Sequence, residues 1–220
     1  MKKMTEANVK DALAGESQAH IKYLAFAEKA AAEKLPNAAR LFKAASFSEQ
    51  VHATNHLKTL GGVGATKDNL DAAAGGEGFE VDEMYPAYLA VAQAQGEKTA
   101  ETYLNAALQA EKVHLALYQA AKRALAAGRD AAGAPVHVCS MCGFTMEGEA
   151  PSVCPVCGSA RSPRWMAALL ASETTNAVKD SSGMQLDYQT CRSSPAWSRS
   201  WPRSDRPRAA PGIASRPSTR

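Results

Sequence analysis

The tetrapeptide Glu49-Gln50-Val51-His52 returns as Glu111-Lys112-Val113-His114, and each copy lies in a long Ala-rich stretch with helical periodicity. Residues three apart project from the same face of an α-helix, about one turn apart, so each Glu and His can reach one metal ion together. Two such faces across the core of a helical bundle would form a pocket for two metal ions. The repeated motif therefore predicts a helical protein with a two-metal site.

A lone acidic residue precedes each copy of the motif at nearly the same distance. Glu16 follows Gly15 upstream of the first copy, and Glu77 follows Gly76 upstream of the second, so the chain has the pattern of one helical hairpin used twice. Bundles that bind two irons through carboxylates use a lone Glu from two helices and Glu-x-x-His from the other two. Singly, such residues are usually solvated, but burying all of them without a cation would be very unfavourable. The candidate ligands are Glu16, Glu49, His52, Glu77, Glu111 and His114.

Apolar periodicity and helix-ending residues predict four helices, over residues 5–33, 36–60, 68–95 and 97–127. Pro36 suits the first turn of the second helix, and Gly61-Gly62 ends it. Pro86 should kink the third helix or open a bulge in it. We expect an all-α four-helix bundle of the ferritin-like type over residues 1–130, with a long crossover between helices two and three if these run parallel.

Four of the five cysteines form two Cys-x-x-Cys pairs after an Ala/Gly/Pro linker. The pairs are Cys139 with Cys142 and Cys154 with Cys157, and Gly follows the second Cys of each. Four thiolates from two such knuckles enclose one tetrahedral ion, and in a reducing compartment a metal site is favoured over disulfides. A small metal domain is therefore predicted over residues 131–163. The ligands accept iron and zinc alike.

The net charge of +3 comes from the C-terminal end of the chain. Residues 1–160 contain 15 Lys and Arg against 18 Asp and Glu, whereas residues 161–220 contain 10 against 4. The basic balance therefore gives no indication that the folded part binds nucleic acid, and we expect no nucleic-acid partner. Residues 164–220 are rich in Ser, Pro and Arg and are expected to be disordered, apart from a short helix at 165–170. With neither a leader nor a spanning segment apparent, we expect a cytoplasmic protein that does not bind membranes.

Over about residues 5–160 the chain resembles the rubrerythrins, which combine a ferritin-like di-iron bundle with a rubredoxin-like domain. The resemblance lies in both Glu-x-x-His motifs, the cysteine knuckles and two further segments. One is Ala14-Gly15-Glu16-Ser17-Gln18-Ala19 with Tyr23, and the other runs from Gly76-Glu77-Gly78-Phe79-Glu80 into Glu83-Met84-Tyr85-Pro86. The additional Glu80 separates this pattern from that of ferritins.

The resemblance implies a role for each ligand. Glu49 and Glu111 would bridge the two irons, Glu16 would bind the first, and Glu77 with His114 would bind the second. Glu80 would bind the first iron in the oxidised state and give way to His52 on reduction. Tyr23 and Tyr85 would lie near the irons and hydrogen-bond the Glu ligands, or simply pack in the core.

The implied activity is reduction of hydrogen peroxide to water at the di-iron centre, with Glu77 or Glu80 relaying protons and His52, Tyr23 and Tyr85 completing the catalytic residues. A mononuclear iron held by the four cysteines would return electrons supplied by an NAD(P)H-dependent reductase or a rubredoxin. The resemblance also implies a homodimer. Two alternatives stay open: an iron-oxidising ferritin-like protein with a structural zinc site, and a bundle that serves as a scaffold without redox chemistry.

Overall fold

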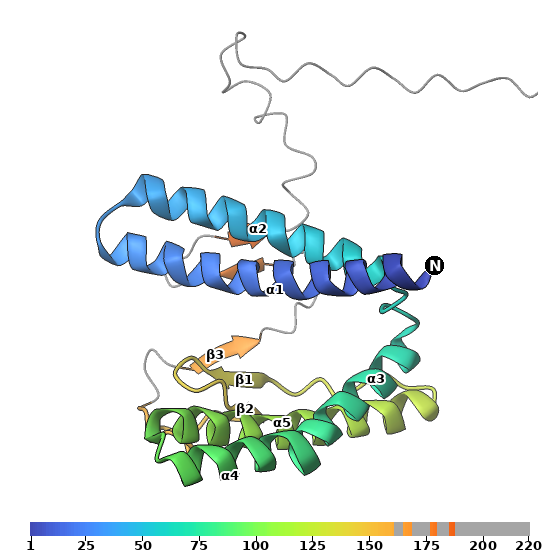
Figure 1. Ribbon diagram of the computed structural model, residues 1–220. Helices are drawn as coiled ribbons and strands as arrows, with labels where there is room; N and C mark the ends of the chain where they lie inside the picture. Colours follow the sequence, from blue (N-terminus) through green and yellow to red (C-terminus); the bar gives the residue numbers. More distant parts are fainter. Residues whose placement is uncertain (161–164, 169–176, 180–184, 188–220) are drawn as a thin grey trace, which may run out of the picture. The chain divides into compact units, whose positions relative to one another are not determined.

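The structure is a computed structural model and describes residues 1–160, 165–168, 177–179 and 185–187. Five α-helices and one π-helical segment make up the first 126 residues (Figure 1). Three of these elements follow one another directly, so they form a single helical course. The elements are α1 (Lys3–Ala32), α2 (Pro36–Thr59), α3 (Thr66–Phe79), η1 (Glu80–Met84), α4 (Tyr85–Gln95) and α5 (Lys98–Ala126).

The first hairpin consists of α1 packed on α2. Small buried side chains at Ala27, Ala30 and Ala39 let the two helices approach closely. Further along, the buried Ser46 hydroxyl donates a hydrogen bond to the carbonyl oxygen of His20, and the His20 ring lies 2.9 Å from the carbonyl oxygen of Ser46. The hairpin is thus joined by packing and by polar contacts.

The second hairpin packs α3, η1 and α4 against α5. An ion pair of 2.6 Å between Lys122 and Asp71 joins α5 to α3. The turn between α4 and α5 contains Gly96 at φ 72°, the left-handed conformation that glycine adopts without strain. All four helices predicted from the sequence are present, the third as the α3–η1–α4 course.

The π-helical segment lies directly before Pro86, at the bulge that the sequence predicts. Proline has no N–H, so the Asp82 carbonyl cannot accept its usual helical hydrogen bond. The chain responds by widening its turn, and the Tyr85 N–H bonds to the Glu80 carbonyl five residues back. The prediction of an irregularity at Pro86 is confirmed.

Only six residues, numbers 60–65, connect α2 to α3. Both ends of this connection are hydrogen-bonded: the Gly62 N–H donates to the Leu57 carbonyl, and the Asn69 side chain bonds both backbone groups of Gly64. The connection is therefore a compact turn and much shorter than the crossover expected from the sequence.

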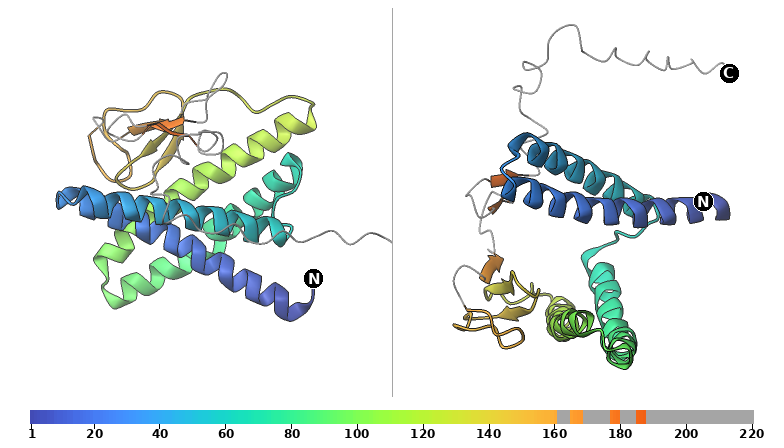
Figure 2. Two further views of the ribbon diagram at one scale, coloured as in Figure 1. Left: turned by 90° about the horizontal axis from the view of Figure 1, so that it is seen from above. Right: turned by 60° about the vertical axis from the view of Figure 1, so that its left-hand side comes forward.

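The four-cysteine module contains a three-stranded antiparallel sheet with the order β2-β1-β3. The strands are β1 (Val136–Cys139), β2 (Thr145–Glu147) and β3 (Trp165–Ala168), and β2 packs on α5 (Figure 2). The prediction of a short helix beginning at Trp165 is wrong, because residues 165–168 form a strand that pairs with the open edge of β1. An isolated helix of one or two turns is unstable in water, whereas pairing with β1 satisfies the backbone.

Two further strands, β4 (Ala177–Lys179) and β5 (Gln185–Asp187), form an antiparallel pair. The other positions of residues 169–220, for which the sequence predicts disorder, lie outside the described residues. Within the described part of the chain, none of the helices combines the length and apolar character needed to cross a membrane.

We expect Gly96→Ala to lower the free energy of unfolding by about 1 kcal/mol, because an L side chain is strained at this positive φ. Nothing lies within 4 Å of the added methyl group, so the loss measures backbone strain alone. Gly75→Ala is the matched control, since Gly75 lies inside α3 with equal space around it. Its helical backbone should make that change stabilising by up to about 1 kcal/mol. Urea denaturation of both variants gives the comparison.

Candidate metal centres

The first hairpin brings together one carboxylate from α1 and a Glu–His pair from α2. Ligand atoms of Glu16, Glu49 and His52 all lie within 4.8 Å of one another. The Nδ1 atom of His52 is 2.8 Å from Glu49 Oε2 and 3.8 Å from Glu16 Oε1. One helical turn separates Glu49 from His52, so both side chains reach the same point beside α1.

The second hairpin repeats this arrangement. Glu77 from α3 meets Glu111 and His114 from α5, again with ligand atoms within 4.8 Å of one another. His114 Nδ1 lies 2.7 Å from Glu111 Oε2 and 3.8 Å from Glu77 Oε1. The two clusters match almost atom for atom, as the sequence repeat predicts.

The electrostatics of the second cluster fit a bound cation. Burial first, and then the neighbouring Glu111 and Glu80 carboxylates, raise the pKa of Glu77 to about 7. The Oε2 atom of Glu77 is buried and lacks a hydrogen-bond partner. A divalent ion would supply this oxygen with a ligand bond and would remove the repulsion between the carboxylates.

Glu80 belongs to η1, one turn beyond Glu77, where the π-helical turn alters the direction in which side chains point. Tyr85 lies nearby: burial first, and then the charges of Glu80, Glu111 and Glu77, raise the pKa of its phenol. Tyr23 makes ring contacts with Phe26 and Phe42 at centroid distances of 6.2 and 6.4 Å. The structure thus places Tyr85 beside the acidic cluster and Tyr23 in an aromatic group between α1 and α2.

A hydrogen-bond chain at His114 fits a proton on its Nε2 atom. The Thr145 hydroxyl lies 3.3 Å from the Gly143 carbonyl oxygen and 2.7 Å from His114 Nε2, so when it donates to the carbonyl it accepts from Nε2. With the proton on Nε2, the lone pair of Nδ1 points toward Glu111 Oε2. Two acceptors at this distance repel unless a proton or a metal ion lies between them, and the arrangement is the usual one for a metal-binding histidine.

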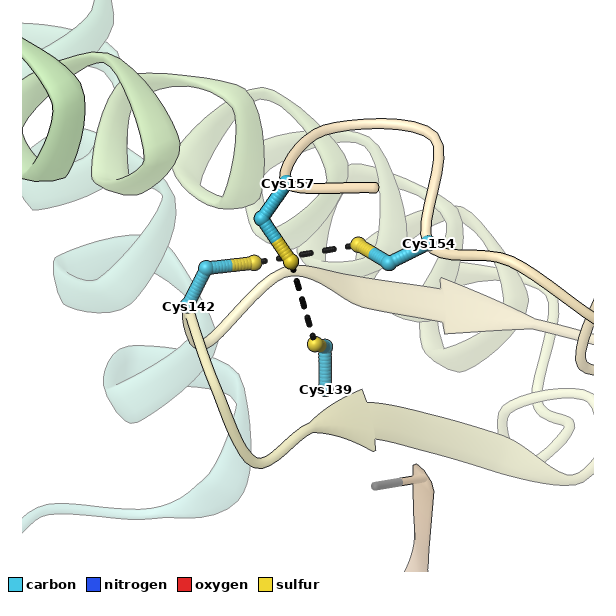
Figure 3. Close-up of side chains that lie close together, drawn as sticks. All are labelled: Cys139, Cys142, Cys154 and Cys157. Atoms are coloured by element: carbon cyan, nitrogen blue, oxygen red, sulfur yellow. Dashed lines mark hydrogen bonds between the residues drawn. The ribbon is translucent and has the colours of Figure 1, made fainter. Parts of the chain in front are cut away.

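The four cysteines surround a single point (Figure 3). The sulfur atoms of Cys139 and Cys157 are 3.8 Å apart, and those of Cys142 and Cys154 are 3.7 Å apart. Tetrahedral metal–sulfur bonds of about 2.3 Å place ligand sulfurs about 3.8 Å apart, whereas disulfide sulfurs lie at about 2 Å. The sulfur positions therefore suit one tetrahedral ion.

Hydrogen bonds favour the thiolate form of Cys139 and Cys157, whereas burial raises the pKa of Cys142 and Cys154. A hydrogen bond from the Ser159 hydroxyl, 3.1 Å from the sulfur, lowers the pKa of Cys157. Cys139 and Cys154 are almost completely buried, whereas Cys157 is exposed. One edge of the module is therefore open to solvent.

Two residues at these sites were not identified from the sequence. Thr145 lies 31 positions from His114 and is brought to it by the packing of β2 on α5. Ser159 is two residues beyond the last cysteine, where a hydroxyl near the sulfur could have been anticipated. No local pattern marks Thr145.

Carboxylate–histidine clusters on paired helices, followed by a four-cysteine module, define the class of di-iron proteins with a ferritin-like bundle and a rubredoxin-like domain. The sequence matches the family described as Rubrerythrin over residues 7–122, and the one described as Rubrerythrin, rubredoxin-like domain over residues 137–162. The chain belongs to the rubrerythrin family. Its residues provide a di-iron site and a four-cysteine metal site, as predicted.

Two relatives identified by sequence support this assignment. Rubrerythrin-2 of Clostridium acetobutylicum is 41% identical over 169 residues, covering 70% of this chain and 92% of the relative. Nigerythrin of Nitratidesulfovibrio vulgaris is 34% identical over 167 residues, covering 70% and 81%. A solved structure of mixed-valence nigerythrin is 31% identical, covering 74% of this chain and 86% of that one, at a TM-score of 0.41.

We expect Thr145→Val to weaken metal binding at the second cluster by about 10- to 100-fold, because His114 Nε2 loses its acceptor. Competition with a chelator under anaerobic conditions measures the affinity. Thr145→Ser keeps the hydroxyl and should bind normally. Thr102→Val is the matched control. Thr102 lies on α5, the helix that carries His114, and its hydroxyl donates a hydrogen bond to the Lys98 carbonyl on an exposed face. Equal affinities for all three variants would show that Thr145 does not orient the ligand.

Proposed function

We propose that this protein reduces hydrogen peroxide to water at its di-iron centre, using electrons that pass through a mononuclear iron in the four-cysteine site. Membership of the rubrerythrin family supports an iron-dependent oxidoreductase. The observation that carries the more specific proposal is a further carboxylate beside the second cluster, that of Glu80, which acts on Glu77. An iron pair supplies two electrons at one place, which is what cleavage of the O–O bond requires.

The ligands of this proposal are the six residues of the two clusters together with Glu80. Glu49 and Glu111 would be shared between the two ions, Glu16 would hold the first, and Glu77 with His114 would hold the second, as the family resemblance implies. Glu80 would hold the first ion in the oxidised state and His52 would hold it in the reduced state, because a hard anionic oxygen suits the more highly charged ion and a neutral imidazole suits the reduced one. The place of Glu80 on a π-helical turn supports this exchange, since such turns are common at functional sites.

Proton delivery in the proposed reaction falls to the acids of the second cluster. A carboxyl group close to the irons can transfer protons while the O–O bond is cleaved, and Glu77 or Glu80 is proposed for this role. The phenol of Tyr85, whose pKa is raised by burial and by the same carboxylates, stays protonated and can donate a hydrogen bond to them.

Electrons are proposed to enter at the exposed edge of the four-cysteine module, around Cys157 and the half-exposed Met141. The donor would be a rubredoxin or an NAD(P)H-dependent reductase. From the knuckle, a path of backbone and side-chain bonds runs through Gly143 and Thr145 to His114 within the same chain. This connection supports a redox role for the module in addition to a structural one.

The competing function is iron oxidation with a structural zinc ion, because the sulfur spacing suits zinc as well as iron. The colour of the purified protein and its metal content decide between the two, since ferric thiolate is red and zinc thiolate is colourless. We expect red protein with iron in both sites.

We expect His52→Ala and Glu80→Ala each to lower anaerobic peroxide consumption by at least about tenfold, because each removes one of the two alternating ligands. Helical content should be unchanged, since both side chains lie at the metal site and not in the packing between helices. Turnover is measured with iron-loaded protein and a chemical reductant, and the metal content is determined on the same samples.

Glu83→Ala is the matched control, since Glu83 is an exposed carboxylate of the same π-helical segment. It should retain wild-type turnover. Normal rates in both the His52 and Glu80 variants would remove the ligand exchange from the proposal, and lack of peroxide consumption by fully iron-loaded wild-type protein would remove the activity itself.

A further inference from the structure

The two hairpins each hold half of the di-iron ligands, so a complete site requires one hairpin to face another. In a ferritin-like bundle the second and third helices run parallel, and the chain between them must travel along the bundle. In this protein that chain is the connection of residues 60–65. Its length therefore determines whether both hairpins of one bundle can come from the same chain.

The distance to be covered follows from helix geometry. Ten residues separate Glu49 from the end of α2 at Thr59, and eleven separate the start of α3 at Thr66 from Glu77. At a rise of about 1.5 Å per residue, these segments measure about 15 and 16 Å. When α2 and α3 are parallel and their ligands lie at the same level, the two lengths add, and the helix ends are about 30 Å apart.

The connection cannot reach that far. From Thr59 to Thr66 there are seven Cα–Cα steps, which span at most about 25 Å when fully extended. The observed connection is not extended, because Gly62 is bonded back to Leu57 and Gly64 is bonded to Asn69. Only Val63 lies between these two hydrogen-bonded turns.

We propose that the bundle forms by exchange between two copies of this chain, so that the α1–α2 hairpin of one copy closes on the α3–α5 hairpin of the other. Each di-iron site then takes Glu16, Glu49 and His52 from one chain and the ligands of the second cluster from its partner. The six-residue connection joins the two bundles of the dimer and no longer has to run along either of them.

Exposed apolar side chains on the same helix stripes as the ligands are consistent with this closure. Eleven residues make slightly more than three helical turns, so Leu41 lies on the same stripe of α2 as His52, and Tyr103 on the same stripe of α5 as His114. Leu41 is 68% exposed and Tyr103 is 59% exposed. Leu125, eleven residues after His114, is 38% exposed on that stripe. Association of the two ligand-bearing faces would bury these side chains together with the metal ions.

This inference rests on the di-metal site and not on the peroxide chemistry, so it can be tested through iron pairs alone. Chain X carries Glu49→Gln with His52→Gln, and chain Y carries Glu111→Gln with His114→Gln. An exchanged X·Y dimer contains one bundle with both halves damaged and one with both halves intact. A bundle made from a single chain is damaged in every combination.

The experiment expresses X and Y together as full-length chains and counts magnetically coupled iron pairs by Mössbauer spectroscopy. Random pairing of exchanged chains should restore about one quarter of the wild-type number of pairs per chain, whereas X alone and Y alone have none. The matched control combines X with a Glu16→Gln chain, which damages the same hairpin twice and should restore none. A repeat with the single substitutions Glu49→Gln and Glu111→Gln guards against misfolding of the double variants.

Two results would overturn the proposal. One is a mixture of X and Y in which the number of coupled pairs stays at the level of the separate variants. The other is wild-type protein that holds its coupled iron pair as a monomer. Restored pairs without peroxide turnover would support the exchanged dimer and reject the proposed activity, so the two proposals fail separately.

Discussion

Repulsion among carboxylates within a helical framework is the constraint on which this protein depends. The helices hold Glu77, Glu111 and Glu80 close enough that burial and neighbouring charge raise the pKa of Glu77 to about 7. Charged groups in such surroundings are stable only with a proton or a cation between them. Binding of metal ions turns the repulsion into attraction, so the same residues that destabilise the empty site provide its affinity.

The hydrogen bond between His114 and Thr145 links the two metal sites of one chain. Thr145 begins β2, directly after the first cysteine knuckle, and its hydroxyl orients the imidazole on α5. Because the same short segment carries Cys142 and contacts a di-iron ligand, the four-cysteine module does more than follow the bundle in sequence. The position of one site is coupled to the position of the other through a few covalent and hydrogen bonds.

Much of this architecture could be predicted because its causes are local. Helical periodicity located all four helices to within about two residues, and the missing N–H of Pro86 marked the π-helical turn. The three-residue spacing of Glu and His, present in two copies, identified the Glu and His that share each cluster. The error at Trp165 has the opposite cause: a short segment without a strong pattern takes its conformation from β1, the strand it pairs with.

By itself, the sequence determined the helices, the two ligand clusters and the cysteine knuckles, since the residues of each lie within one helical hairpin or one short segment of the chain. The tertiary structure alone decided that Thr145 meets His114, and that α2 and α3 are joined by a compact turn in place of a long crossover. The first depends on how segments far apart in the chain pack, and the second on hydrogen bonds that Gly62 and Gly64 make at the two ends of the connection. Periodicity carries no information about either, because it describes which face a residue occupies and not what that face meets.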